Sequence, residues 1–364
     1  MSKPRALSAA LSCLLSLSVV VAAAGCAKSV PGGGSSSSAL GSTKACLVSG
    51  ADGFGDKGVS QVAAQSLDTA VSQLGVQSDR AEAHSAADYP SAIQSMVSAG
   101  CTLIIGASPD QADALAAAAR ANADLHFGLI GATKPVSEAN LKPVRFQSSQ
   151  AGFLAGYLAA ASSTSGTVGT FGSTNAPSVT LYMDGFSQGV IYFNQKKSHQ
   201  VKLVGWAMGS QSGDFLGGSD PEHDADAARA KTESLISQGA DVIMPVTGGA
   251  TSGATSGAAQ GVAAHAGTRL VGAGTDLCTS LPDSCANTLG SAVAGIDQMV
   301  VELIKQSGNF SNVTLVGTLA NGGESLTGVG KGAPVPQAVI DDLAAVRQDI
   351  VSGSLKVTSP SSVS

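Results

Sequence analysis

The sequence predicts an α/β fold built from two Rossmann-like lobes that are joined by a multi-crossover hinge. Short apolar runs typical of buried strands alternate with stretches of helical periodicity, which is the pattern of a parallel sheet covered by helices. The alternation occurs in two successive halves of similar size, and the chain of 364 residues is long enough for two domains. The segments that follow are too short for a third domain, so we expect them to cross between the lobes and complete them.

The first lobe begins with residues 44–61, which hold a short apolar strand at 45–48 and then a glycine-rich loop. Helical periodicity follows at 62–74, and Gly75 ends it. Residues 108–111 form a capping box with a proline at the first helical position. The same reasoning predicts further strands at 80–84, 101–105, 125–130 and 144–146, and helices at 88–99 and 108–121.

The second lobe opens with a helix at 149–161, whose small residues allow close packing against a neighbour. Next come predicted strands at 167–171, 201–206, 241–246 and 269–273, helices at 177–193, 224–238 and 254–264, and the final helix, strand and helix at 289–305, 313–319 and 336–350. We therefore assign 44–148 plus about 288–308 to lobe 1, 149–287 plus about 309–358 to lobe 2, and 359–364 to a C-terminal tail.

The composition excludes several classes of protein. Charged residues make up 13% of the chain and aromatic residues 4%, with 45 glycines, which is too apolar for a disordered chain. The formal net charge is −6, so a surface that binds the phosphate backbone of nucleic acid is not expected.

The first residues resemble a bacterial lipoprotein signal. Lys3 and Arg5 precede an apolar stretch at 6–24, and small residues stand directly before Cys26. We expect a signal peptide at 1–25, diacylation of the Cys26 sulfur, and a flexible Gly/Ser-rich tether over 26–43. An ordinary secreted protein or an uncleaved anchor is the alternative. No other stretch approaches the roughly 20 apolar residues of a spanning helix, so this interpretation places the protein on the extracytoplasmic face of the cell membrane.

Four further cysteines remain after the lipid-bearing one. An even number of cysteines outside the cytoplasm favours disulfides. Cys278 and Cys285 flank a turn-rich loop, and we expect them to pair. Cys46 and Cys101 each stand at the start of a predicted strand and could be bridged if those strands are neighbours. A metal site is not expected, because the chain has neither a CxxC motif nor a nearby pair of histidines.

The candidate site follows from the fold, because open α/β sheets bind ligands at the carboxyl ends of their strands. Asp52, Phe54 and Asp56 lie in the loop after the first strand, where the two carboxylates could contact a ligand or instead cap the next helix. Gly248 and Gly249 precede a helix, where their N–H groups could hold an anionic or carbonyl group or simply form a tight turn.

Other residues admit a simpler interpretation. Phe215 could stack on a ligand or pack within its lobe, and Trp206, the one tryptophan, is more typical of a core. The acidic residues at 220–226 suit the first turn of a helix better than a metal site. No set of residues combines a nucleophile, a base and an orienting group, so we expect no enzyme, no cofactor and no metal.

Six motifs occur in the order known from one family. They lie at 55–61, 146–161, 212–221, 239–249, 271–276 and 350–357, and the segment at 146–161 is the most specific. With this order and spacing, residues 44–357 resemble the basic membrane lipoprotein family of ABC-transporter solute-binding proteins, whose best-known members bind purine nucleosides. The resemblance implies a type I periplasmic-binding-protein fold.

The resemblance also implies a site in which aromatic rings stack on a purine and polar side chains grip the ribose. Residues 56–61 carry Ser60 and Gln61 in the family's ligand-binding motif, and Asp276 and Phe215 match two more of its positions. Four positions depart from the pattern. They are Val59 in place of the stacking aromatic, Ser60 in place of an asparagine, Gly274 in place of an aspartate and Ala294 in place of a lysine, so Phe54 or Trp206 would have to supply the missing ring.

These observations predict a monomeric, lipid-anchored solute-binding protein of an ABC importer. It would bind a small polar ligand, nucleoside-like by family, in the cleft between the lobes and deliver it to a permease. The alternative is a sensory or structural envelope lipoprotein that has kept the fold without transport, and the lost ribose-binding residues motivate it.

Overall fold

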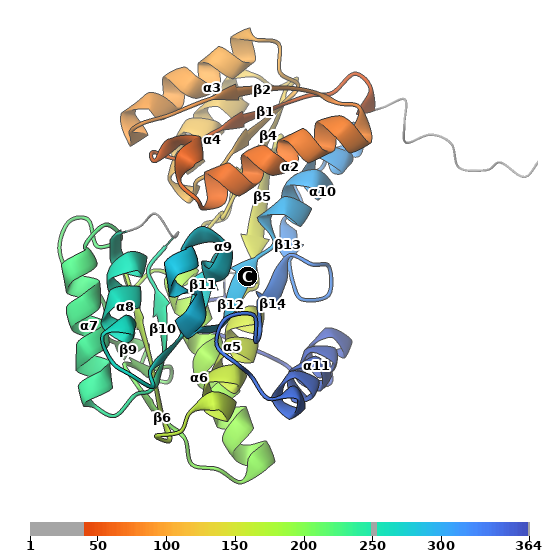
Figure 1. Cartoon of the computed structure of the whole chain (residues 1–364). Helices are drawn as coiled ribbons and strands as arrows, with labels where there is room; N and C mark the ends of the chain where they lie inside the picture. Colours follow the sequence, from red (N-terminus) through yellow and green to blue (C-terminus); the bar gives the residue numbers. More distant parts are fainter. Residues whose placement is uncertain (1–39, 249–252, 363–364) are drawn as a thin grey trace, which may run out of the picture. The chain divides into compact units, whose positions relative to one another are not determined.

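The computed structural model describes residues 40–248 and 253–362, and within them two six-stranded sheets confirm the predicted pair of α/β lobes (Figure 1). The strands are β1 (Lys44–Val48), β2 (Gln77–Ala81), β3 (Leu103–Gly106), β4 (His126–Ile130), β5 (Leu141–Phe146), β6 (Thr167–Gly172), β7 (Lys202–Val204), β8 (Trp206–Ala207), β9 (Ser212–Gly213), β10 (Val242–Val246), β11 (Arg269–Gly274), β12 (Thr288–Ala294), β13 (Leu315–Gly317) and β14 (Glu324–Thr327). The helices are α2 (Val59–Leu74), α3 (Tyr89–Ser98), α4 (Ala112–Ala121), α5 (Ser148–Ser162), α6 (Pro177–Lys197), α7 (Ala225–Ser237), α8 (Gly253–Ala263), α9 (Leu277–Ser280), α10 (Ile296–Lys305) and α11 (Gln337–Ser352).

The first sheet has the strand order β13-β5-β4-β3-β1-β2, and all its pairs are parallel. Its central strands are buried on both faces, which explains why they read as continuous apolar runs. Helices α2 and α10 cover one face and α3 and α4 the other (Figure 1). The predicted capping box at Ser108 is present, with its hydroxyl accepting from the Asp110 N–H.

The second sheet has the order β14-β12-β11-β10-β6-β7, and only β14 is antiparallel to its neighbour. Without β13, the first sheet has the order β5-β4-β3-β1-β2. Without β14, the second sheet has the equivalent order β12-β11-β10-β6-β7. Helices α5, α6 and α11 cover one face, and α7, α8 and α9 cover the other. In this doubly wound arrangement the second strand of each lobe lies on one side of the first strand, β1 or β6, and the later strands lie on its other side. Such a reversal of strand order creates a crevice at the carboxyl ends of the strands.

Within the described residues the chain passes between the two sheets three times, which fits the predicted multi-crossover hinge. The passages follow β5, β12 and β13. Backbone hydrogen bonds tie the three passages together: the Gln147 N–H donates to the Gly317 carbonyl at 2.8 Å and the Gly295 N–H to the Gly323 carbonyl at 2.9 Å. From the sequence we assign about 288–308 to lobe 1 and about 309–358 to lobe 2. This assignment needs correction, because β12 lies in the second sheet and β13 in the first.

The helix predicted at 289–305 is wrong in its first half. Residues 288–294 form strand β12, most of it fully buried, and the helix starts only at Ile296. Gly290 and Gly295 weaken a helix there, and the apolar residues before Gly295 fill a buried strand equally well. Strand β14 was not predicted, the strand expected at 80–84 lies at 77–81, and the strand expected at 201–206 is split into β7 and β8.

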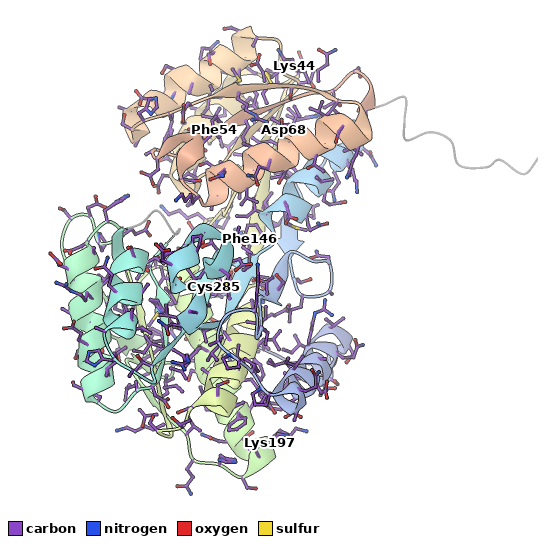
Figure 2. All side chains as sticks on the ribbon, viewed as in Figure 1. Lys44, Phe54, Asp68, Phe146, Lys197 and Cys285 are labelled. Carbon is purple, nitrogen blue, oxygen red and sulfur yellow. A yellow bond between two sulfur atoms is a disulfide. The ribbon has the colours of Figure 1, made fainter. Side chains whose placement is uncertain are left out.

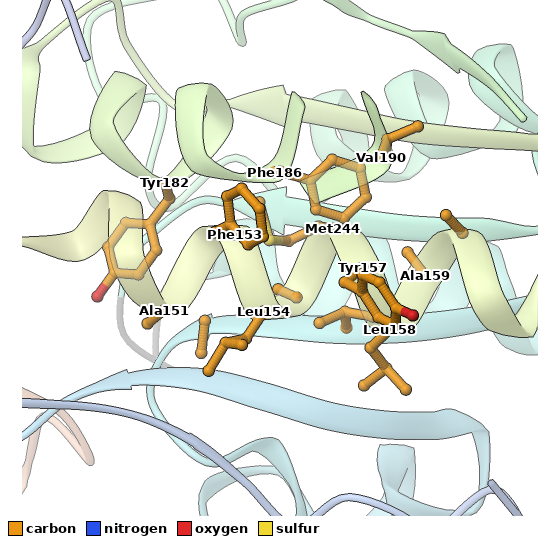
Figure 3. Close-up of a cluster of buried hydrophobic side chains, with 14 of the residues drawn as sticks. Ala151, Phe153, Leu154, Tyr157, Leu158, Ala159, Tyr182, Phe186, Val190 and Met244 are labelled. Carbon is orange, nitrogen blue, oxygen red and sulfur yellow. The ribbon is translucent and has the colours of Figure 1, made fainter. Parts of the chain in front are cut away.

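Helices α5 and α6 pack with their backbones in close contact, as the small residues at 149–161 predict. A methyl group on Gly156 would lie 2.0 Å from the Phe186 carbonyl oxygen, and one on Gly185 would lie 2.1 Å from the Ser149 carbonyl oxygen. Helix α5 is buried all round, and Figure 3 shows Phe153, Tyr157 and Leu158 of α5 within the surrounding cluster. This helix is therefore the centre of the second lobe.

Both disulfides are present. Cys278 and Cys285 are joined as predicted, and Cys46 and Cys101 are also joined, because β1 and β3 are adjacent parallel strands. The predicted lipidation site Cys26, the predicted signal peptide and most of the predicted tether lie outside the described residues. Within 40–248 and 253–362, no helix combines the length and apolarity that a membrane span needs.

Candidate functional site

A pocket of about 670 Å³ lies where loops from the two sheets meet. The first sheet contributes the loops that follow β1, β3 and β4, and the second contributes those that follow β6, β10 and β11. In each sheet these include the two loops on either side of the point where the strand order reverses, which is where doubly wound folds bind ligands. The pocket therefore matches the predicted position at the carboxyl ends of the strands.

The loop after β1 lines the pocket with Asp52, Asp56 and Ser60. Asp56 also caps α2, because its carboxylate accepts from the backbone N–H groups of Gly58, Ser60 and Gln61 at 2.8–3.0 Å. The buried Ser60 hydroxyl accepts from the Gly50 N–H at 3.0 Å. The capping interpretation of Asp56 is confirmed, and the loop is held rigidly against the pocket.

An acidic side of the pocket is formed by Asp52 and Asp110 from the first lobe and Glu222 from the second. The Glu222 side chain faces the pocket, but loss of surrounding water raises its carboxyl pKa, with the Ser173 hydroxyl opposing the shift. This side of the pocket suits ligand groups that donate hydrogen bonds or carry positive charge.

His223 links the two lobes at the same side. Its Nδ1 lies 2.7 Å from Asp220 Oδ1, and its Nε2 lies 3.7 Å from Asp52 Oδ1 of the other lobe. The hydrogen bond to Asp220 is the main cause that raises the His223 pKa, and the Asp52 charge adds to it. Protonated His223 is thus attracted to carboxylates on both lobes.

Three aromatic side chains line the pocket. Tyr89 comes from the start of α3 and Tyr182 from α6. Phe146, which is labelled in Figure 2, comes from the end of β5, where the chain leaves the first sheet. Tyr89 and Tyr182 are only 3% and 6% exposed, so most of each ring is fixed by packing. Burial is the main cause that raises the pKa of both phenols. The aromatic surface is therefore rigid and uncharged at neutral pH.

Several residues predicted for the site do not line this pocket. Trp206 is buried in the second lobe, and its Nε1–H donates to Asp184 Oδ1 at 2.9 Å. Phe215 packs edge-on against Trp206, with ring centroids 5.8 Å apart. Phe54 packs against the core of the first lobe, so neither Phe54 nor Trp206 replaces the missing ring. The proposed roles of these three rings therefore need correction, because packing within each lobe removes them from the strand ends.

The remaining predicted residues divide in the same way. Gly248 lines the pocket, whereas Gly249 lies outside the described residues. Asp276 is turned away to cap α9, where its carboxylate accepts from the Cys278 N–H at 3.0 Å. Gln61 sits on α2 without lining the pocket.

The four positions that depart from the family pattern all line the pocket, and they are Val59, Ser60, Gly274 and Ala294. Val59 is 36% exposed there, and Ala294 ends strand β12. Gly274 has a backbone φ angle of 87°, which residues other than glycine adopt only with strain. An aspartate at this position would require a different backbone, so the loss of that carboxylate is built into the local geometry.

Sequence reasoning missed Tyr89, Asp110, Arg145, Tyr182 and Glu222 as pocket residues. Asp110 could have been found by applying the strand-end rule to every strand, because it follows β3 as Asp52 follows β1. Arg145, by contrast, lies within β5, and Tyr182 and Glu222 gave no local signal that they face the same space.

The described part of the chain holds no group of three or more His, Cys, Asp or Glu side chains placed to bind a metal ion. The cluster at 220–226 instead forms local pairs, such as Asp226 with Arg229 at 3.0 Å. The pocket can therefore bind a ligand through hydrogen bonds, aromatic contact and charge.

Glu324 lies directly behind the pocket wall. It is 1% exposed and accepts from the Ser148 hydroxyl at 2.9 Å, while its Oε2 has no hydrogen-bond partner among the described residues. Burial raises the pKa of this carboxyl well above its usual value. A neutral, protonated Glu324 that supports Ser148 is the state consistent with these contacts.

We expect Glu324→Gln to change how stability depends on pH. A buried carboxyl with a raised pKa holds a proton that the unfolded chain releases above about pH 4.3, so wild-type stability falls as pH rises from there toward the folded pKa. Glutamine has no proton to lose, so the fall should be shallower. Urea unfolding between about pH 5 and pH 8 measures this.

The surface variant Glu233→Gln on α7 is the matched control and should keep the wild-type profile. A Glu324→Gln profile parallel to that of the wild type would show that Glu324 is ionised in the folded protein.

The comparisons with known proteins agree with this geometry. A family model described as ABC transporter substrate-binding protein PnrA-like matches residues 44–357. No curated protein matches the sequence. The fold is similar to that of ABC transporter solute-binding proteins from Aeropyrum pernix K1, with 19% identity, a TM-score of 0.69 and coverage of 87% of this chain and 94% of that one. The fold is also similar to that of an ABC transporter solute-binding protein from Conexibacter woesei DSM 14684, with 18% identity, a TM-score of 0.67 and coverage of 87% of this chain and 99% of that one.

The structure of a transcriptional activator of the comK gene from Bacillus halodurans is also similar, with 20% identity, a TM-score of 0.70 and coverage of 86% of this chain and 99% of that one. Identities this low show a shared fold and do not identify a ligand. Because proteins with different roles share the fold, function has to be argued from the site itself.

Proposed function

Because the chain belongs to the PnrA-like family of ABC transporter substrate-binding proteins, we propose that it binds a small polar solute in the pocket between its two sheets and delivers it to an ABC permease. The predicted type I periplasmic-binding-protein fold is confirmed by the similar structures. The observation that carries the proposal is the convergence of strand-end loops from both sheets on one pocket. The family is one of solute-binding proteins and not of enzymes.

The chemistry of the pocket supports a nucleoside-like ligand. The pocket volume of about 670 Å³ lies within the usual range for small-molecule sites. Tyr89, Phe146 and Tyr182 offer aromatic surface for a base, and Asp52, Asp110 and Glu222 can accept from hydroxyl or amino groups. Since Val59, Gly274 and Ala294 replace family residues of the site, we propose that the ligand is held mainly by these other side chains.

The setting we propose is the outer face of the cell membrane, with Cys26 lipidated and the folded body acting as a monomer on its tether. The signal-like sequence at 1–25 and the Gly/Ser-rich segment at 26–43 support this placement. Two disulfides fit an oxidising compartment.

The test is to identify what the protein carries. Small molecules released by denaturing the purified full-length protein are analysed by mass spectrometry, and calorimetry is then run with nucleosides, sugars and amino acids. We expect one polar solute, nucleoside-like in mass, to be released and to bind again at a 1:1 ratio. A protein that releases nothing and binds no member of the three classes would contradict the proposal.

A second candidate is a sensory or structural envelope lipoprotein without a transport role. It is favoured by the four replaced family residues, all of which line the pocket. Solute uptake by a deletion strain separates the two. Normal uptake of the bound solute would support the second candidate, and lost uptake that the gene restores would support transport.

A further inference from the structure

Residues 358–362 follow the region matched by the family and form a separate segment against α6. Gln188 on α6 pairs with Thr358 in both directions: its Nε2 donates to the Thr358 carbonyl at 2.5 Å, and its Oε1 accepts from the Thr358 N–H at 3.3 Å. The segment then turns back on itself, with the Ser362 N–H donating to the Ser359 carbonyl at 3.1 Å. It is therefore held in a defined conformation.

A buried carboxylate anchors the centre of the segment. Asp184 on α6 is fully buried and accepts from Trp206 Nε1, from Gln211 Nε2 and from the Ser359 hydroxyl at 2.9, 2.8 and 2.5 Å. A buried carboxylate needs such donors, and Ser359 supplies one of three. The hydrogen bond from Ser359 to Asp184 thus holds the segment on α6 and also stabilises the buried carboxylate.

A second contact holds the segment toward the pocket. The Ser361 hydroxyl donates to Gln211 Oε1 at 2.9 Å and lies 2.6 Å from the Thr180 hydroxyl on the first turns of α6. Those same turns line the pocket, through Ser178, Leu181 and Tyr182 among others. The next residue, Ser362, lines the pocket as well.

We propose that residues 358–362 are part of the ligand site: they close the pocket beside the start of α6 and place Ser362 in contact with the bound solute. This inference rests on the proposed function. A serine can both donate and accept a hydrogen bond, so Ser362 suits a polar ligand. The contacts that hold the segment are hydrogen bonds, and four residues contact it directly, namely Thr180, Asp184, Gln188 and Gln211.

The test compares the full-length protein with two shortened chains, using adenosine, guanosine, cytidine and uridine as calorimetric probes. A chain ending at Val357 loses the whole segment, and a chain ending at Ser361 keeps the anchoring contacts but loses residues 362–364, Ser362 among them. For a nucleoside that the full-length protein binds, we expect binding about fivefold weaker without Ser362 and at least about tenfold weaker without the segment, because ligand hydrogen bonds and wall contacts are lost.

Circular dichroism and thermal unfolding show whether both shortened chains are folded. Ser359→Ala in the full-length chain provides a second measure, since it removes one anchor and should weaken binding by less than the complete truncation. If folded shortened chains bind the nucleoside as tightly as the full-length protein, this inference is wrong and the proposed function is unaffected. If the full-length protein binds none of the four, the nucleoside assignment fails, and this inference fails with it.

Discussion

Replacing Gly156 by alanine is expected to destabilise the second lobe by about 3 kcal/mol, which is at the upper end for overpacking a close contact. The added methyl group would lie 2.0 Å from the Phe186 carbonyl oxygen, and backbone atoms cannot move aside as a flexible side chain can. A methyl group added to Gly185 or Gly189 on α6 would likewise lie 2.1 Å from an α5 carbonyl oxygen. The space between the helices therefore admits no extra carbon, and the helices would have to separate. Urea unfolding measures the change in the free energy of unfolding.

Gly217→Ala is the matched control, because it adds the same methyl group where no atom lies within 4 Å. It should leave the free energy of unfolding unchanged to within about 0.5 kcal/mol, as surface substitutions usually do. A Gly156→Ala protein as stable as this control would mean that α5 and α6 are not in backbone contact.

The second large effect concerns the disulfide between Cys46 and Cys101. The bond closes a loop with a sequence separation of 55, so the loop-entropy relation predicts a loss of about 4 kcal/mol when both cysteines become alanine. Both residues are fully buried, and Cys101 precedes β3 at the end of the sheet opposite the site loops, so we expect reduced stability but unchanged solute affinity in the folded protein. Denaturant unfolding measures the stability and calorimetry the affinity.

The Cys278–Cys285 pair provides the comparison within the same chain. Its sequence separation is 7, for which the same relation gives about 2 kcal/mol. The double alanine variant of this pair should therefore be the more stable of the two. Equal losses would show that loop entropy does not govern the contribution of the longer bridge.

Much of the fold could be predicted because local signals and tertiary packing agree. The capping box at Ser108, the apolar run before Gly106 and the small residues of α5 each had one consistent interpretation. The prediction failed at 288–294, where a short apolar segment fits a buried strand or a buried helix. Its strand conformation depends on pairing with β11 and β14, which no local pattern encodes.

The site was less predictable than the fold. Asp52, Asp56, Ser60 and Gly248 line the pocket, and the rule that ligands bind at the carboxyl ends of parallel strands leads to them. The aromatic residues were chosen wrongly: Trp206 and Phe215 pack on each other, whereas Tyr89 and Tyr182 reach the pocket from helices. Which face of a helix meets a pocket depends on how two lobes pack, and a single sequence does not specify it.

The most direct test of the account is a calorimetric titration of the solute released from the purified protein into wild type and into Ser178→Trp. Ser178 is exposed and lines the pocket at the start of α6, so an indole there fills ligand space without disturbing a core. We expect 1:1 binding by the wild type and a loss of affinity of at least about a hundredfold in the folded variant, because the ligand and the indole compete for the same volume. Unchanged affinity in Ser178→Trp would place the ligand elsewhere and contradict the central claim that this pocket is the solute site.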